Sequence, residues 1–216
     1  MTRGILFLAF GSKYIAQAVE SARYAREYGL PITLITDNDS RLPDRIFDKV
    51  IRSEIRKDSI YAYKGELIPT LTPYDTTLYL DSEAKLVGDP EFAFDKAERH
   101  GIAIALAPFY DLDSRDMNLV KKKEGLPQYN CGVMFFNKQI AGHVLKEWSV
   151  RCFNEKANCD QIILTQVMHD KHFSPYVLTA NWNCRSKWQF LHGNLKVWHT
   201  TKPLPERKHY GRPERV

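Results

Sequence analysis

The feature of this 216-residue sequence that most constrains its fold is an alternation of short apolar runs with longer stretches of helical periodicity. The apolar runs predict strands at residues 5–10, 31–36, 76–80, 101–107 and 131–137. Helical spacing of apolar side chains predicts helices at residues 13–28, 90–100, 139–153 and 159–170. This alternation is typical of a mostly parallel sheet flanked by helices, so we predict an α/β fold in a single domain.

The two ends of the predicted domain differ in composition. Residues 203–216 contain three prolines and few apolar side chains, so we expect a domain over residues 1–203 and a basic tail over residues 204–216. The last 32 residues hold eight Lys or Arg against two Glu, whereas the whole chain has a net charge of +5. This segment therefore either meets an anionic partner or is a solvated basic tail. Residues 111–128 are polar and lysine-rich and predict a loop.

The composition also bears on location. No stretch approaches the 18 apolar residues of a membrane span, and the apolar run at residues 4–10 is too short for a signal peptide. We therefore expect a soluble, cytoplasmic protein with no membrane span. The four cysteines are scattered without a CxxC pair, which argues against a zinc site and favours reduced, buried thiols.

Two carboxylates follow the predicted strand at residues 76–80. Asp81 and Glu83 are separated by one residue, at the carboxyl end of a buried strand, which is where open α/β sheets bind ligands. In an extended segment residues i and i+2 point the same way, so both carboxylates can face one hard cation such as Mn²⁺ or Mg²⁺. The alternative is an acidic turn that is simply solvated.

Several segments on both sides of this pair resemble those of a known family, and they occur in the same order along the chain. Residues 72–90 (TPYDTTLYLDSEAKLVGDP) resemble the DxD-bearing segment of GT-A glycosyltransferases, especially those similar to glycosyltransferase family 8. Further similarities occur at residues 129–137 (YNCGVMFFN), 160–161 (DQ), 181–185 (NWNCR) and 199–203 (HTTKP). The resemblance spans residues 4–203. It implies a GT-A type, Rossmann-like sheet and the transfer of a sugar from a nucleotide-sugar donor.

The resemblance also implies a metal site. Asp81, Glu83 and His199 are expected to bind Mn²⁺ or Mg²⁺, and Lys202 to contact the diphosphate of the donor. Glu83 stands where the family pattern has Asp. Because Glu is one methylene longer, it can still bind a metal, but from a different distance to the backbone.

Further residues are expected to contact the donor. The resemblance implies that Asn130, Gly132, Asp160 and Gln161 surround the sugar, with Asp160 and Gln161 as catalytic candidates. Asp160 is also the candidate general base if the reaction inverts the anomeric centre, although the family retains it.

The turn after the first strand is where the family holds the nucleoside. It contains Ala9, Phe10, Gly11 and Tyr14, which lack the GxGxxG fingerprint of dinucleotide-binding domains. Backbone groups of Ala9 and Phe10 can pair with the base and Tyr14 can stack on it, unless Tyr14 is a core aromatic.

Asp37 and Lys64 complete the candidate donor site. Asp37 closes the second predicted strand and either contributes to the nucleoside site or caps a turn. Lys64 either reaches a phosphate or is an exposed lysine.

The leading functional hypothesis is metal-assisted transfer of a hexose from a nucleoside diphosphate sugar, with UDP as the expected nucleotide and a retaining outcome. One alternative is a GT-A binding module with impaired catalysis, which Glu83 would explain. Another is a transferase that acts on nucleic acid through the basic C-terminal segment. The acceptor can be a glycan, a lipid-linked sugar, a protein or a nucleic acid, since fold does not fix function.

Overall fold

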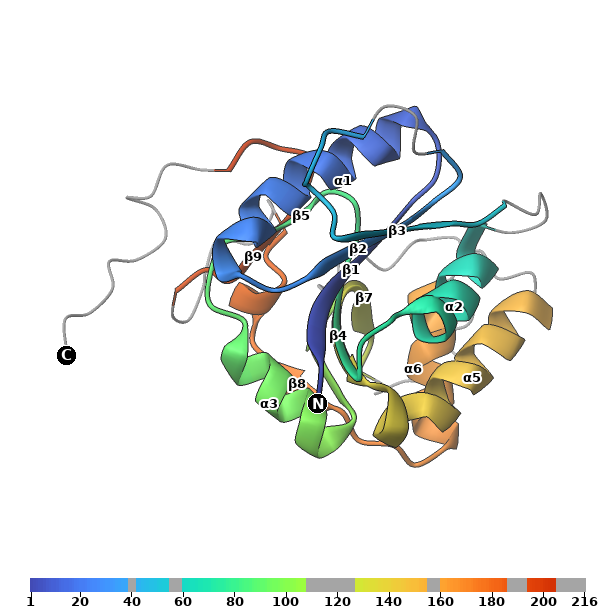
Figure 1. Cartoon of the computed structure of the whole chain (residues 1–216). Coiled ribbons are helices and arrows are strands. Elements are labelled where there is room, and N and C mark those ends of the chain that lie inside the picture. Colours follow the sequence, from blue (N-terminus) through green and yellow to red (C-terminus); the bar gives the residue numbers. More distant parts are fainter. Residues whose placement is uncertain (39–41, 55–59, 108–126, 155–159, 186–193, 205–216) are drawn as a thin grey trace.

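A computed structural model describes residues 1–38, 42–54, 60–107, 127–154, 160–185 and 194–204, and for residues 60–63 it describes the backbone alone. Within these residues, seven strands form a central sheet with helices on both faces (Figure 1). The strands in spatial order are β3 (Lys49–Arg52), β2 (Ile32–Thr36), β1 (Arg3–Ala9), β4 (Thr76–Leu80), β7 (Tyr129–Asn137), β6 (Ile102–Leu106) and β8 (Tyr176–Leu178). This architecture confirms the predicted α/β fold.

The sheet is mixed, because β7 runs antiparallel to both of its neighbours. The pairs β1–β2, β2–β3, β1–β4 and β6–β8 are parallel, whereas β4–β7 and β6–β7 are antiparallel. The chain moves outward from β1 to β2 and β3, and then returns to place β4 on the other side of β1. The carboxyl ends of β1 and β4 therefore meet where the strand order reverses, the position at which α/β sheets bind ligands.

Two apolar cores follow from the alternation of side chains along the strands. On one face, Phe7 and Leu80 belong to a core with α1 (Ser12–Ala25) and α3 (Glu91–His100). On the other, Leu6 and Tyr79 belong to a core with α2 (Ile60–Leu71), α5 (Lys138–Asn154) and α6 (Asp160–Asp170). Trp148 of α5 is fully buried in the second core, and its indole Nε1 donates a 2.8 Å hydrogen bond to the carbonyl of Asp160. This bond holds the start of α6 against α5.

A small second sheet brings the C-terminal part of the domain to the site. It pairs β5 (Ala84–Leu86) with β9 (Val197–His199) in antiparallel register, so that Ala84 lies opposite His199. A short helical turn, η3 (Ala180–Trp182), precedes the segment that contacts β9. Residues distant in sequence from the acidic pair are thereby placed beside it.

The long predicted elements correspond closely to observed ones, and the differences lie in shorter elements and in strand direction. The first predicted helix continues from α1 into η1 (Arg26–Tyr28) and ends at Gly29. Strand β3 and helix α2 were not predicted, and the direction of β7 was not anticipated. Residues 111–126 of the predicted loop, Cys159 and residues 205–216 lie outside the described residues, so the tail and the boundary at residue 203 stay predictions.

Two further expectations concern thiols and membranes. Cys131, Cys152 and Cys184 are buried, as predicted, and burial raises the pKa of the Cys184 thiol to about 11. No helix in the described part of the chain is long and apolar enough to cross a membrane. The cytoplasmic location stays a prediction.

A pair of glycine substitutions tests the packing of β1. A Cβ on Gly4 would overlap the ring of Tyr74, which is buried and shares a 2.7 Å hydrogen bond with Thr33. Gly4→Ala should therefore lower the free energy of unfolding by about 1–3 kcal/mol, the usual cost of overpacking a core. Gly142, inside α5, has open space around its Cα. Gly142→Ala should raise the free energy of unfolding by about 0.5–1 kcal/mol, because alanine favours the helix. Urea denaturation measures both, and a Gly4→Ala variant as stable as the parent contradicts the packing described here.

Candidate functional site

A cavity of about 350 Å³ lies at the carboxyl ends of β1 and β4, within the size range of small-ligand sites. It is lined by eleven of the fourteen residues that the sequence nominated: Ala9, Phe10, Tyr14, Lys64, Asp81, Glu83, Asn130, Gly132, Asp160, Gln161 and His199. These residues come from six separate stretches of the chain. The sequence motifs therefore converge on one site.

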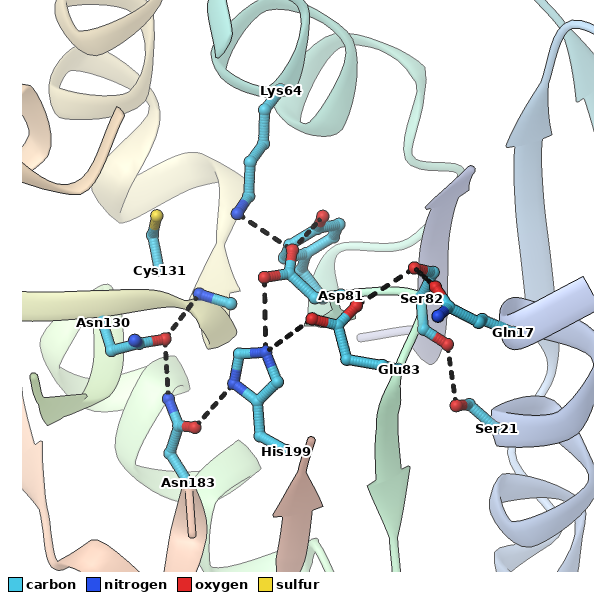
Figure 2. Close-up of polar contacts among 12 residues, drawn as sticks. Gln17, Ser21, Lys64, Asp81, Ser82, Glu83, Asn130, Cys131, Asn183 and His199 are labelled. Carbon is cyan, nitrogen blue, oxygen red and sulfur yellow. Dashed lines mark hydrogen bonds and ion pairs between the residues drawn. The ribbon is translucent and has the colours of Figure 1, made fainter. Parts of the chain in front are cut away.

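Asp81 lies directly after β4, and its two carboxylate oxygens have different surroundings (Figure 2). Oδ1 accepts hydrogen bonds from the Tyr79 hydroxyl at 2.7 Å and from the Lys64 ammonium at 2.9 Å. Oδ2 faces Nε2 of His199 at 3.5 Å. Burial alone would raise the pKa of Asp81, but Lys64 and His199 hold it well below its usual range. Asp81 is thus an anion that presents Oδ2 to the cavity.

A turn of the chain after Asp81 brings the Glu83 carboxylate to the same imidazole nitrogen of His199. The amide of Ala84 donates a 2.9 Å hydrogen bond to the carbonyl of Asp81, which closes a turn over the acidic pair. The predicted extended segment is therefore wrong, because this bond bends the chain before β5 begins. The carboxylates nevertheless face the same way, and Oε1 of Glu83 lies 3.7 Å from Nε2 of His199. Burial raises the pKa of Glu83, yet the contact with His199 lowers it overall.

His199 is the last residue of β9 and is only 3% exposed. Its Nε2 faces the two carboxylates, and its Nδ1 lies 2.8 Å from the side-chain oxygen of Asn183 (Figure 2). Burial lowers the pKa of His199, but Asp81 and Glu83 raise it overall, because they stabilise the cationic ring. The ring is thereby fixed from both sides.

Gly132, in β7, allows this close arrangement. A Cβ at this position would overlap the His199 ring and Oδ2 of Asp81. The Gly132 carbonyl also accepts a 2.8 Å hydrogen bond from the amide of Asp81. Strand β7 therefore lies against the acidic turn without a side chain between them.

Lys64 of α2 joins two carboxylates in the cavity. Its ammonium lies 2.9 Å from Oδ1 of Asp81 and 3.2 Å from Oδ2 of Asp160, and its side chain is 14% exposed. Burial lowers the pKa of Lys64, but these two carboxylates raise it well above its ordinary value. The alternative that Lys64 is an exposed lysine is wrong, because α2 packs against α5 and directs this side chain into the cavity.

Asp160 opens α6 and receives a second contact from β7. The Cys131 thiol donates a 3.2 Å hydrogen bond to Oδ2 of Asp160. Burial and the nearby Asp160 carboxylate raise the pKa of Cys131 well above its ordinary value, so the group remains a thiol. Gln161, the next residue of α6, also lines the cavity.

Tyr14 lines the cavity, whereas Gly11, Asp37 and Lys202 are the three predicted residues that do not. Tyr14 is 45% exposed, so the alternative of a core aromatic is wrong. Oδ1 of Asp37 accepts a 2.9 Å hydrogen bond from the amide of Gly11, so Asp37 holds the turn between β1 and α1. Lys202 is exposed and does not line the cavity, and its carbonyl accepts a 3.0 Å hydrogen bond from Trp198 Nε1. The ligand contacts of these residues stay predictions.

Some residues of the site were not predicted, among them three polar ones. Tyr79 and Arg185 line the cavity, and Asn183 contacts His199 from behind. Asn183 and Arg185 both fall in the segment at residues 181–185 that resembles the family. This resemblance could have pointed to both residues. Tyr79 lies two residues before Asp81, on the same strand edge, and alternation along β4 could have indicated it.

The side-chain atoms of Asp81, Glu83 and His199 that face one another are too far apart to hold a metal ion as they stand. Among the described residues, no group of three or more His, Cys, Asp or Glu side chains is arranged to hold a metal ion. Asp81, Glu83 and His199 come near to such a group, with facing atoms 3.5 and 3.7 Å apart. Neighbouring ligands around an octahedral ion at 2.0–2.1 Å are about 3 Å apart. Shifts of well under 1 Å in these side chains would close the difference.

Comparison with known proteins supports the fold. No protein-family model matches the sequence, and no curated protein matches it in sequence. Solved structures do match: the galactosyltransferase LgtC, in complex with donor and acceptor sugar analogues, has a TM-score of 0.66 at 13% identity, over 96% of this chain and 92% of that one. The glycosyltransferase GlyE of Streptococcus pneumoniae TIGR4 has a TM-score of 0.61 at 18% identity, over 86% of this chain and 47% of that one. The bifunctional glycosyltransferase WbbM has a TM-score of 0.59 at 13% identity, over 85% of this chain and 40% of that one. At these identities the likeness establishes the fold, and the chain has the GT-A fold of these glycosyltransferases.

Proposed function

We propose that this protein is a glycosyltransferase that moves a hexose from a nucleoside diphosphate sugar to an acceptor, with UDP as the nucleotide. The observation that carries the proposal is the convergence of Asp81, Glu83 and His199 at the ligand-binding edge of a GT-A sheet. LgtC, which shares this fold, was crystallised with donor and acceptor sugar analogues. By analogy, the cavity described here holds the donor.

The three proposed ligands suit Mn²⁺ or Mg²⁺. Two carboxylates and one imidazole are groups that such ions accept, and the missing side chain at Gly132 lets Asp81 and His199 lie close together. Asp81, Glu83 and His199 would hold the ion, which would supply positive charge to the departing diphosphate. Lys202, next to the site in sequence, would contact the same diphosphate.

The other residues of the cavity bind and orient the donor. The exposed Tyr14 ring offers a stacking surface for the base, beside the backbone of Ala9 and Phe10. The turn that Asp37 and Gly11 hold together would fix the nucleoside end.

At the sugar end, Asn130, Gly132 and Gln161 surround the hexose. Asp160 places a carboxylate where positive charge develops as the bond from sugar to phosphate breaks, which fits a retaining reaction. Lys64 holds Asp160 and Asp81 in place through its two ion pairs. Any direct contact of Lys64 with phosphate is secondary to these pairs.

The carboxylate of Asp81 is the first point to test. Asp81→Asn should keep the fold but reduce the Mn²⁺-dependent release of UDP from a UDP-sugar by about 100-fold or more, the scale of losing one charge contact at a developing charge. Asp44→Asn, at an exposed position, serves as the control. Equal rates for the two variants, or full activity in EDTA, would refute the metal-assisted mechanism.

The same measurements test the two alternative functions. If the parent binds UDP-sugar without turnover, the protein is a binding module. Salt-sensitive binding to DNA would indicate a nucleic-acid acceptor.

Two substitutions at Glu83 distinguish a metal ligand from a solvated turn residue. Glu83→Asp keeps the carboxylate and should retain substantial activity, whereas Glu83→Gln removes the charge and should lose most of it. The turn is closed by the backbone bond from Ala84 to Asp81, so neither substitution removes the bond that holds it. Mn²⁺ titrations of the two variants supply the measurement. If both behave like the parent, Asp81 and His199 alone hold the ion.

Lys202 should act on the phosphates and not on the nucleoside. Lys202→Ala should weaken UDP-sugar binding about tenfold, the scale of one charged hydrogen bond, and leave uridine binding unchanged. Lys196→Ala, in the same basic segment, is the matched control. Calorimetry with both ligands measures the effect, and an equal loss for uridine and UDP-sugar would assign Lys202 a structural role.

A further inference from the structure

A chain of buried amides runs from β7 to the His199 ring (Figure 2). The backbone N–H of Gly132 donates to the side-chain oxygen of Asn130 at 3.0 Å, and Nδ2 of Asn183 donates to the same oxygen at 3.0 Å. The oxygen of Asn183 then lies 2.8 Å from Nδ1 of His199. Asn130, Asn183 and His199 are each less than 5% exposed, so water does not compete for these bonds.

The direction of this chain follows from its first member. A backbone N–H can only donate, so the Asn130 atom that it meets must be the oxygen. That oxygen then requires the amide nitrogen of Asn183, which turns the Asn183 oxygen toward the ring. An amide oxygen can only accept, so Nδ1 of His199 must carry hydrogen.

The hydrogen on Nδ1 determines the state of Nε2, on the opposite side of the ring. A neutral imidazole with hydrogen on Nδ1 has its lone pair on Nε2, and Nε2 faces Oδ2 of Asp81 and Oε1 of Glu83 at 3.5 and 3.7 Å. These three electron-rich atoms together attract a cation: a proton on Nε2 in the free protein, or a divalent ion that takes the place of that proton. The arrangement is that of a histidine held ready as a metal ligand by its other nitrogen.

We propose that Asn183, fixed by Asn130 and Gly132, is a positioning residue that holds His199 in the Nδ1–H tautomer and presents Nε2 to a divalent cation. The cation rests on the proposed function, whereas the tautomer does not. Backbone bonds hold the two residues in register, because the Cys184 amide donates to Val197 and the His199 amide donates to Cys184, at 3.0 and 2.9 Å. The segment that carries Asn183 is thus tied to the strand that carries its target.

The experiment compares two asparagines of the same segment in the 216-residue protein. Asn183→Leu removes the acceptor at Nδ1, whereas Asn181→Leu removes a buried amide that contacts Thr179 and Asn194 and does not contact His199. Long-range ¹H–¹⁵N spectra of histidine-labelled protein, recorded over a pH series so that the neutral ring is observed, report the tautomer. The His199 signal is assigned with His199→Gln, and Mn²⁺ affinity is followed by electron paramagnetic resonance.

We expect the Nδ1–H tautomer in the parent and in Asn181→Leu. Asn183→Leu should populate the Nε2–H tautomer and bind Mn²⁺ about 10–100-fold more weakly, the usual effect of removing the partner of a metal-binding histidine. Asn183→Asp keeps an acceptor at Nδ1 and should keep the tautomer, with a smaller loss of affinity. This second variant tests the inference even if Asn183→Leu does not fold.

The outcomes separate this inference from the proposed function. An Nε2–H tautomer in the parent, or a tautomer and an affinity unchanged by Asn183→Leu, overturns the inference and leaves the proposed function standing. An Nδ1–H tautomer that Asn183→Leu abolishes, in a protein that binds no Mn²⁺, overturns the metal-assisted function and supports the positioning of His199 by Asn183.

Discussion

The missing side chain at Gly132 is the constraint on which the site depends. It lets β7 lie directly against the end of β4, so that the Asp81 amide bonds to the Gly132 carbonyl while the Asp81 carboxylate and the His199 ring share the adjacent space. The Gly132 amide also starts the hydrogen-bond chain through Asn130 and Asn183. One position without a Cβ thus sets both the spacing of the charged groups and the orientation of the imidazole.

The charged side chains near Gly132 form two groups, one around Lys64 and one around His199. Lys64 lies between Asp81 and Asp160, and each pair offsets part of the cost of burying its members. Glu83 and the second oxygen of Asp81 face His199 instead. Charged groups gathered in one partly buried cavity add little to the stability of a fold and are typical of a functional site.

Much of this could be predicted from the sequence, because the relevant signals are local. Apolar periodicity located most strands and helices, and the short motifs nominated eleven of the residues that line the cavity. Strand β3 escaped prediction because it is a short, largely exposed edge strand, and helix α2 because it contains Gly65 and Pro69. The antiparallel direction of β7 was not readable, because a buried strand has the same apolar pattern in either direction.

The sequence by itself determined that Asp81 and Glu83 lie together at the end of a buried strand, since they are separated by one residue and the pattern around them is strongly apolar. Only the tertiary structure decided what they face. His199 and Asn183 come from more than 95 residues further along the chain, and β5–β9 pairing brings them into place. Which nitrogen of His199 carries hydrogen depends on a chain of hydrogen bonds across three segments. Such a property does not exist until the segments are packed, because a hydrogen bond has a direction only when both of its partners are in place.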